Sequence, residues 1–316
     1  MKSSMPKVLH PLAGKPLVQH VIDTAHALHT RNTILITGHG AEVVEPLLQK
    51  AYPNKALQFA KQMPQLGTGH AVQQALPFLD HDGVVVVLSG DVPLTQVDTL
   101  QALIQACDGK NLALLTIDFE DPTGYGRIVR DADGKVLRIV EQKDATADEL
   151  TIREGNTGVM AVPVIQLRAW LARLKNSNAQ GEYYLTDIIE MAVADGIEVK
   201  PLIAPTIAEV LGINDKLQLA EVEAEHRRLR ARELMQAGAI RFCQIDSCRL
   251  GGVNEVLAVM LLAKRFGIAD RVDYLAWGDI EAIAEGALGM VTVNSTSGTL
   301  ALARGAPDNV TFVIVS

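Results

Sequence analysis

The sequence predicts an α/β protein whose core is an open parallel sheet. Over about the first 200 residues, apolar residues at helical spacing alternate with short β-branched runs. The run Val84–Leu88 is entirely apolar and has the length of a strand that is buried on both faces. Because strands that alternate with helices form parallel βαβ units, we expect a sheet with helices on both sides.

The elements of this sheet can be placed in order along the chain. Helices are expected over residues 16–29, 41–51, 69–77 and 95–107. Strands are expected over residues 33–37, 57–61, 84–88 and 112–117. The pattern then changes, and residues 126–130 and 135–142 predict a hairpin inserted beside the main sheet. A further strand at 157–162 and helices at 163–174 and 186–194 complete this part.

A long charged helix and a second, shorter α/β stretch follow. Residues 215–237 are typical of a helix on a solvated surface, with a protein-binding helix as the alternative. Beyond residue 241, strands are expected at 242–245, 272–276, 291–293 and 310–315, and helices at 254–266, 279–287 and 299–304. The sequence therefore predicts three parts: residues 1–214, a linker helix over 215–240, and an α/β segment over 241–316.

Composition excludes several classes of function. The 316 residues are 48% hydrophobic and 21% charged, which excludes a disordered chain. The formal net charge of −8 argues against a broad nucleic-acid surface, although a small anionic ligand needs only a few donors. Three scattered cysteines indicate a reducing compartment. No apolar run reaches ~18 residues and no signal-peptide core is present, so we expect a cytoplasmic protein without a membrane span.

Candidate sites lie where predicted strands end, because ligands of open parallel sheets bind at that edge. Gly90-Asp91 follows the valine run, where a carboxylate can hold Mg²⁺ or simply cap the next helix. Gln65–His70 places two glycines at a helix start, and Asp121–Arg127 is a glycine-containing loop. Each of these is ambiguous alone, as is the single phosphate-binding candidate Lys7, and no Walker or dinucleotide-binding motif is present.

Taken together, these pieces resemble a known family. The motifs that carry the resemblance are Pro6–His10, Ala13–Leu17, Leu66–Ala71, Gly90–Leu94, Asp121–Arg127, Ile139–Ala145, Asn156–Gly158 and Gln180–Asp187. In this order they resemble the pyrophosphorylase domain of the bacterial N-acetylglucosamine-1-phosphate uridyltransferases, from Met1 to about Ile240. The family makes UDP-N-acetylglucosamine, a precursor of peptidoglycan and lipopolysaccharide.

The resemblance implies a Rossmann-like sheet, a Mg²⁺ cofactor, and UTP and N-acetylglucosamine 1-phosphate as substrates. Lys7 and Asp91 would be the catalytic residues, with Asp91 and Asn214 as the metal ligands. The nucleotide would be bound by Lys7, Gln62, Gly67, Thr68, Ser89 and Gly90, and the sugar by Gly126, Glu141, Asn156, Tyr184 and Thr186. This assignment requires the side chains of Asp91 and Asn214 to lie close together.

The sequence departs from the family pattern at its start. Family members open with a strand and a loop of the form L-x-x-G-x-G-T-R-M, whereas this sequence starts at what resembles the final Met. We therefore expect the sheet to lack its first, central strand and its two neighbours to carry unpaired backbone groups, at roughly 1–3 kcal/mol each. We also expect little or no uridyltransferase activity; the alternatives are a nucleotide-sugar-binding fragment without turnover and a non-functional mosaic fusion.

The C-terminal part departs from the family as well. No hexapeptide repeat follows residue 240, so we expect no acetyltransferase activity and a monomer rather than the family's trimer. Gln244–Glu255 resembles one βα unit of the enolase-superfamily sugar-acid dehydratases, in which Asp246 would support a catalytic His. Val291–Gly298 is similar to a stretch of capsular-polysaccharide export proteins. A lyase centred on Asp246 is a further alternative, but residues 241–316 lack the acidic metal ligands that it needs.

Overall fold

The computed structural model describes residues 5–54, 57–237, 242–245, 261, 264–265, 269–272 and 310–315. The chain divides into two compact units. The first comprises Met1–Val222 together with Leu302–Ser316, and the second comprises Glu223–Ala301. We describe each unit by itself.

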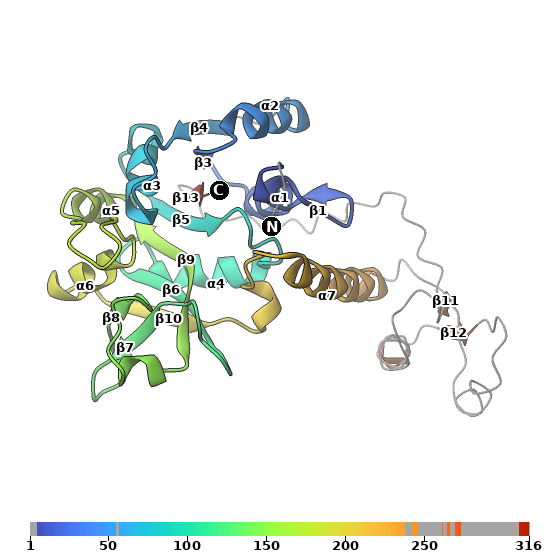
Figure 1. Cartoon of the computed structure of the whole chain (residues 1–316). Coiled ribbons are helices and arrows are strands. Elements are labelled where there is room, and N and C mark those ends of the chain that lie inside the picture. The colour runs from blue at the N-terminus through green and yellow to red at the C-terminus, as the bar shows by residue number, and fades with distance from the viewer. Residues whose placement is uncertain are drawn as a thin grey trace. The chain divides into compact units, whose positions relative to one another are not determined.

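The first unit is built on one mixed sheet (Figure 1). From edge to edge its strands are β10 (Val199–Ile203), β6 (Leu112–Asp118), β9 (Glu154–Pro163), β5 (Val84–Ser89), β13 (Val310–Val315), β3 (Asn32–Thr37) and β4 (Leu57–Lys61). The predicted hairpin is β7 (Arg127–Arg130) and β8 (Val136–Val140), and it joins the sheet where β7 pairs with β9. The predicted α/β class is confirmed.

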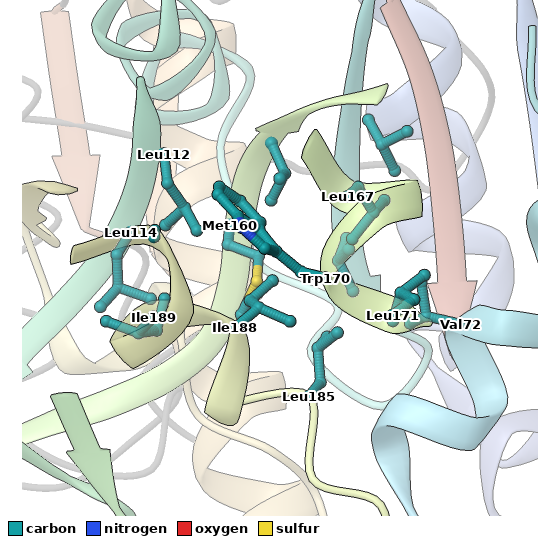
Figure 2. Packing of buried hydrophobic residues seen from close by; sticks show 14 of the residues in the cluster. Val72, Leu112, Leu114, Met160, Leu167, Trp170, Leu171, Leu185, Ile188 and Ile189 are labelled. Carbon is teal, nitrogen blue, oxygen red and sulfur yellow. The ribbon is translucent and has the colours of Figure 1, made fainter. Parts of the chain in front are cut away.

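Helices cover both faces of this sheet, as predicted. One apolar cluster includes residues of α1 (Leu17–Ala27), α2 (Ala41–Ala51) and α4 (Val97–Cys107). The opposite cluster includes residues of α3 (Thr68–Ala75), α5 (Val164–Leu171) and α6 (Asp187–Ala194), and Figure 2 shows part of it around Trp170. Residues of the run Val84–Leu88 belong to the two clusters in turn, because successive strand residues point to opposite faces of the sheet.

Two strands differ from the prediction. β9 runs antiparallel to β5 and to β6, so the sheet is mixed rather than wholly parallel. β10 was not expected; it pairs in parallel with β6 at the edge of the sheet. Its Pro201 has no backbone N–H to donate, which an edge strand tolerates and which weakens the strand pattern in the sequence.

The centre of the sheet contains the largest departure. β13 lies between β3 and β5 and is parallel to both, with Val313 opposite Ile34 on one side and Val87 on the other. The expectation of unpaired backbone groups on β3 and β5 is therefore wrong. A segment that follows α7 (Lys216–Gln236) by more than 70 residues supplies the strand between them.

The described part of the second unit contains a small parallel pair. β11 (Phe242–Ile245) lies where a strand was predicted and pairs in parallel with β12 (Ala269–Val272), which starts before the predicted strand at 272–276. The predicted strand at 291–293 and helices at 279–287 and 299–304 lie outside the described residues, as does Asp246.

Helix α7 crosses the boundary between the units and has the character of a solvated surface helix. Glu223 pairs with Arg227, and Arg230 pairs with Glu233. Leu217 is exposed, whereas Val222 is buried. Among the described residues, none of the helices combines the length and apolar character needed to cross a bilayer.

Candidate functional site

Three side chains from distant parts of the sequence meet where β5 ends. The chain turns after this strand, with the N–H of Val92 donating to the carbonyl of Ser89 at 3.2 Å. This turn places Asp91 just beyond the carboxyl end of β5. The Lys7 Nζ donates to Asp91 Oδ2 and also to Asn214 Oδ1, the latter at 3.0 Å. Asp91 and Asn214 thus both accept hydrogen bonds from the Lys7 ammonium group. The alternative in which Asp91 caps the next helix is wrong, because Gln96 is the N-cap residue of α4.

The same pair fits a divalent cation. A carboxylate and an amide oxygen that converge on one cationic group are the donor types that Mg²⁺ prefers, and such sites are completed by substrate phosphates and water. Within the described ranges no group of three or more His, Cys, Asp and Glu side chains could hold a metal ion. Asp91 and Asn214 therefore offer two oxygen atoms of the type that Mg²⁺ prefers.

A tightly closed loop lies between β4 and α3. Gly67 has a φ of +103°, and a Cβ on it would come within 2.7 Å of the Tyr183 carbonyl oxygen. Two backbone bonds pin the loop, from Gly69 N to Tyr183 O at 2.7 Å and from Tyr183 N to Leu66 O at 2.8 Å. The buried Gln62 donates from Nε2 to the Gly67 carbonyl at 2.9 Å.

Thr68 ties this loop to a second segment. Its Oγ1 accepts from the backbone N–H of Leu185 at 3.1 Å. The three predicted nucleotide residues Gln62, Gly67 and Thr68 therefore lie together at one edge of the sheet, against residues 183–185.

Replacing Gly67 by Ala tests whether close approach governs this loop. The variant is expected to lose about 3 kcal/mol or more of unfolding free energy, because the Cβ meets backbone atoms and the φ is positive. The matched control is Gly134→Ala: its φ is +80° but no atom lies within 4 Å of the added Cβ, so only about 1–2 kcal/mol of backbone strain is expected. Equal losses for the two variants in urea unfolding would contradict the close-packed loop.

The predicted sugar residues form a second group beside the hairpin. Thr186 Oγ1 donates to Glu141 Oε1 at 2.9 Å. A Cβ on Gly126 would lie 3.5 Å from both carboxylate oxygens of Glu141, and the Asn156 N–H donates to the Gly126 carbonyl at 2.8 Å. Gly126 and Thr186 thus lie beside the Glu141 carboxylate, and Asn156 joins this group through the Gly126 backbone.

Tyr184 belongs to the same region through residues that the sequence analysis did not single out. Its hydroxyl donates to Asp144 Oδ2 at 3.2 Å and accepts from Gln180 Nε2 at 2.8 Å. Both partners lie inside motifs that carry the family resemblance, so the motifs could have identified them. The segment 178–186 therefore contacts both the nucleotide loop and the sugar group.

Burial and like charges shift the acids of this region. Burial raises the pKa of Glu141, the nearby Asp144 adds to the shift, and the Thr186 hydroxyl opposes it. Burial also raises the pKa of Asp187 from 3.8 to about 6, with further contributions from Glu190, Glu141 and Asp144. In the folded protein Asp187 thus takes up a proton as the pH falls through about 6.

This shift predicts a pH-dependent stability. Between pH 4 and about 6 the unfolded chain has released the Asp187 proton while the folded protein retains it, so unfolding free energy falls as the pH rises. Asp187→Asn removes this contribution, and the variant is expected to be more stable relative to the parent at pH 7 than at pH 4. Urea unfolding at both values measures it, with the exposed Asp133→Asn as control. A difference that is the same at both pH values would contradict the assignment.

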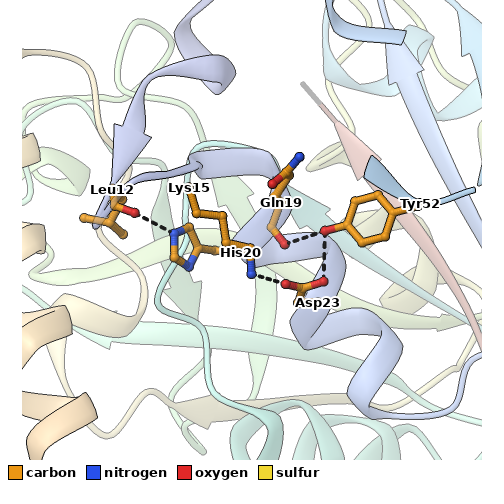
Figure 3. Close-up of polar contacts among 6 residues, drawn as sticks. All are labelled: Leu12, Lys15, Gln19, His20, Asp23 and Tyr52. Carbon is orange, nitrogen blue, oxygen red and sulfur yellow. Dashed lines mark hydrogen bonds and ion pairs between the residues drawn. The ribbon is translucent and has the colours of Figure 1, made fainter. Parts of the chain in front are cut away.

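The Ala13–Leu17 motif has a structural role rather than a place in either group. Lys15 Nζ pairs with Asp23, whose other oxygen accepts from the Tyr52 hydroxyl at 2.9 Å (Figure 3). Burial and the Asp23 charge raise the pKa of Tyr52, so its hydroxyl stays a donor. These contacts fasten the small hairpin of β1 (Pro11–Leu12) and β2 (Lys15–Pro16) to α1.

Curated proteins of bacterial origin are similar in sequence to this chain. The chain is 56% identical over 241 residues to the bifunctional protein GlmU of Methylibium petroleiphilum, covering 75% of this chain and 52% of that protein. It is 54% identical over 264 residues to the GlmU protein of Paracidovorax citrulli, covering 81% and 55%. The chain spans about half the length of the curated relatives it matches.

Solved structures show the same fold at low sequence identity. HddC from Yersinia pseudotuberculosis matches with a TM-score of 0.52 and 17% identity, over 72% of this chain and 92% of that one. The nucleoside-diphosphate-sugar pyrophosphorylase of Vibrio cholerae matches with a TM-score of 0.54 and 14% identity, over 70% and 93%. These matches support the fold alone.

Two family models match different parts of the sequence. The model for enolase C-terminal domain-like proteins matches residues 184–306, which agrees with the resemblance predicted for Gln244–Glu255. The nucleotidyl transferase model matches residues 2–211, which contain every strand of the sheet except β13 and every predicted site residue except Asn214. The family predicted from the sequence motifs is confirmed: the chain belongs to the nucleotidyl transferase family.

Proposed function

We propose that the first unit transfers a uridylyl group from UTP to N-acetylglucosamine 1-phosphate, giving UDP-N-acetylglucosamine and pyrophosphate, in a Mg²⁺-dependent reaction. The observation that carries the proposal is the meeting of Asp91, Asn214 and Lys7 at the carboxyl end of β5. The similarity to GlmU proteins supports the choice of substrates.

The triphosphate would occupy the position between Lys7 and the end of β5. There the Lys7 ammonium group would move from Asp91 to a phosphate oxygen. Its positive charge would stabilise the negative charge on the phosphoryl group that is being transferred. Asp91 and Asn214 would hold the metal, which when bound neutralises phosphate charge. Ser89 and Gly90, at the turn after β5, would contact the nucleotide.

The base would be recognised at the loop between β4 and α3. Its Gly67 packs against the Tyr183 backbone, which fixes the loop, and the Gln62 amide and Thr68 hydroxyl would offer hydrogen bonds to a pyrimidine edge. Because bonds to residues 183–185 hold the loop, these groups are positioned before a ligand binds, which reduces the ordering cost of binding.

The sugar phosphate would bind between the hairpin and the start of α6. The Glu141 carboxylate is a strong acceptor for a sugar hydroxyl; Thr186 and Gly126 lie beside it, and Asn156 is bonded to Gly126. Tyr184 would form one side of the same subsite.

An oxygen of the sugar phosphate would then form the new bond to the α-phosphorus of UTP, and the bond to the β-phosphate would break as pyrophosphate leaves. Positioning and charge neutralisation suffice for this reaction.

Pyrophosphate release tests the proposal. In keeping with the low activity expected from the sequence, we expect slow release that requires the full chain, UTP, N-acetylglucosamine 1-phosphate and Mg²⁺ together. Release is expected to be much less when CTP or galactose 1-phosphate replaces its counterpart. Calorimetry with UDP-N-acetylglucosamine accompanies it. Binding without turnover would indicate a nucleotide-sugar-binding module instead of an enzyme. The absence of both binding and turnover would overturn the proposal.

A further inference from the structure

A buried acid outside the proposed binding groups secures the segment that carries Asn214. Glu209 lies in a short 3₁₀ helix (Ile207–Glu209) and is only 6% exposed. Its carboxylate accepts from the Thr99 hydroxyl at 2.7 Å and from the backbone N–H of Gln96. A buried carboxylate needs such partners, and here all of them come from the first turn of α4.

The position explains why the residue is an acid. Helix α4 starts after Gln96, which makes no side-chain capping bond of its own, so the first N–H groups of the helix need an acceptor from elsewhere. The Glu209 carboxylate provides it, and the positive end of the helix dipole favours its negative charge. Burial raises the pKa of Glu209, and the bonds from Thr99 and Gln96 oppose that shift.

Two more bonds continue this attachment toward the site. The Thr95 hydroxyl donates to the Glu209 carbonyl at 3.0 Å, and the N–H of Ile213 donates to the Asp91 carbonyl at 3.1 Å. The segment 209–213 thus runs beside residues 91–99 and is fixed at both ends. Asn214 follows directly, and its Oδ1 lies on the same Lys7 ammonium as Asp91.

We infer that Glu209 is a positioning residue that holds Asn214 in register with Asp91, so that the two oxygens form one cation site. The inference rests on the proposed function for the identity of the cation, but the register itself is a property of this chain. Glu209 touches neither the metal nor the substrate in this scheme, and it acts by fixing the 3₁₀ helix to α4.

The test compares four variants of the full chain. Glu209→Ala removes the carboxylate, and Glu209→Gln retains an acceptor for the Thr99 hydroxyl. Thr99→Val removes that donor from the other side. The control is Asp195→Asn, at the residue that follows α6. It weakens the hydrogen bond that Trp170 donates to Asp195. Thermal unfolding establishes the temperature at which every variant is folded.

The first readout is hydrogen exchange at the Ile213 amide, which requires no ligand. We expect exchange at least about tenfold faster in Glu209→Ala, a smaller increase in Thr99→Val, and values near the parent for Glu209→Gln and Asp195→Asn. The second readout is Mn²⁺ binding in the presence of UTP, followed by electron paramagnetic resonance. There we expect Glu209→Ala to bind the metal about 10–100-fold more weakly, with rescue by Glu209→Gln.

The two readouts separate the possible failures. Parent-like Ile213 exchange and parent-like Mn²⁺ binding in folded Glu209→Ala would overturn the positioning role. Faster exchange in a protein whose parent form binds neither Mn²⁺ nor UTP would support the positioning role and overturn the proposed function instead. Equal changes in Ile213 exchange and Mn²⁺ binding in Glu209→Ala and Asp195→Asn would show that Glu209 contributes only to overall stability. That result would also overturn the inference.

Discussion

Deletion of residues 302–316 is expected to abolish cooperative folding of the first unit. These residues include β13, which pairs with β3 on one side and β5 on the other. Without it, the two strands on which the sheet is centred expose unpaired backbone groups, each costing roughly 1–3 kcal/mol when buried. A domain of this size is stabilised by about 5–15 kcal/mol in total, so several such groups exceed the whole margin.

Circular dichroism and urea unfolding of the shortened chain measure this effect. A peptide with the sequence of residues 308–316, added in trans, is expected to restore a cooperative transition, whereas a scrambled peptide is not. Val313→Pro in the full chain is a milder version, because proline removes one ladder donor from a central strand and leaves its acceptor unpaired, at a cost of roughly 1–3 kcal/mol. An unchanged transition in the shortened chain would contradict the central place of β13.

Asp91→Asn is expected to lower kcat/KM for pyrophosphate release by about 10²–10³-fold. The amide retains the shape and one oxygen of the carboxylate but removes the charge that would hold the metal and that faces Lys7. The exposed fraction of the Asp91 side chain is 20%, so solvent only partly screens that charge. Steady-state kinetics at saturating UTP and varied Mg²⁺ measure the loss.

The matched control is Asp80→Asn. Asp80 also lies beside β5, but before the start of the strand, and it pairs with Arg31 at 3.1 Å. Its replacement removes the same charge at the opposite end of the strand and is expected to leave the kinetics within about twofold, since surface pairs contribute little. Similar losses in the two variants would contradict a specific role for Asp91.

Most helices and strands of the first unit follow from local pattern. Periodicity locates α1, α2 and α4 within a few residues, because each buries one face against the sheet. The direction of β9 and the position of β13 depend on pairing between segments far apart in the sequence, which no local pattern records. β10 is missed because an edge strand with a proline lacks the apolar alternation of a buried one.

The site shows the same division. The sequence identifies Asp91 and Asn214 as candidates through the motifs around them, but their meeting on one ammonium is a result of tertiary structure. Glu209 carries no local signal, because its partners in α4 are more than 100 residues away in the sequence. Residue types that can bind a ligand are thus predictable, whereas the residues that hold them in place are not.

The central claim is that Asp91 and Asn214 form one cation site that a triphosphate completes. Its most direct test is Mn²⁺ binding by the full chain with and without UTP, followed by electron paramagnetic resonance, for the parent, Asp91→Asn, Asn214→Ala and the double variant. We predict one UTP-dependent site that each single substitution weakens and whose loss in the double variant is less than additive, as for two ligands of one ion. Undiminished UTP-dependent binding in the double variant would contradict the claim.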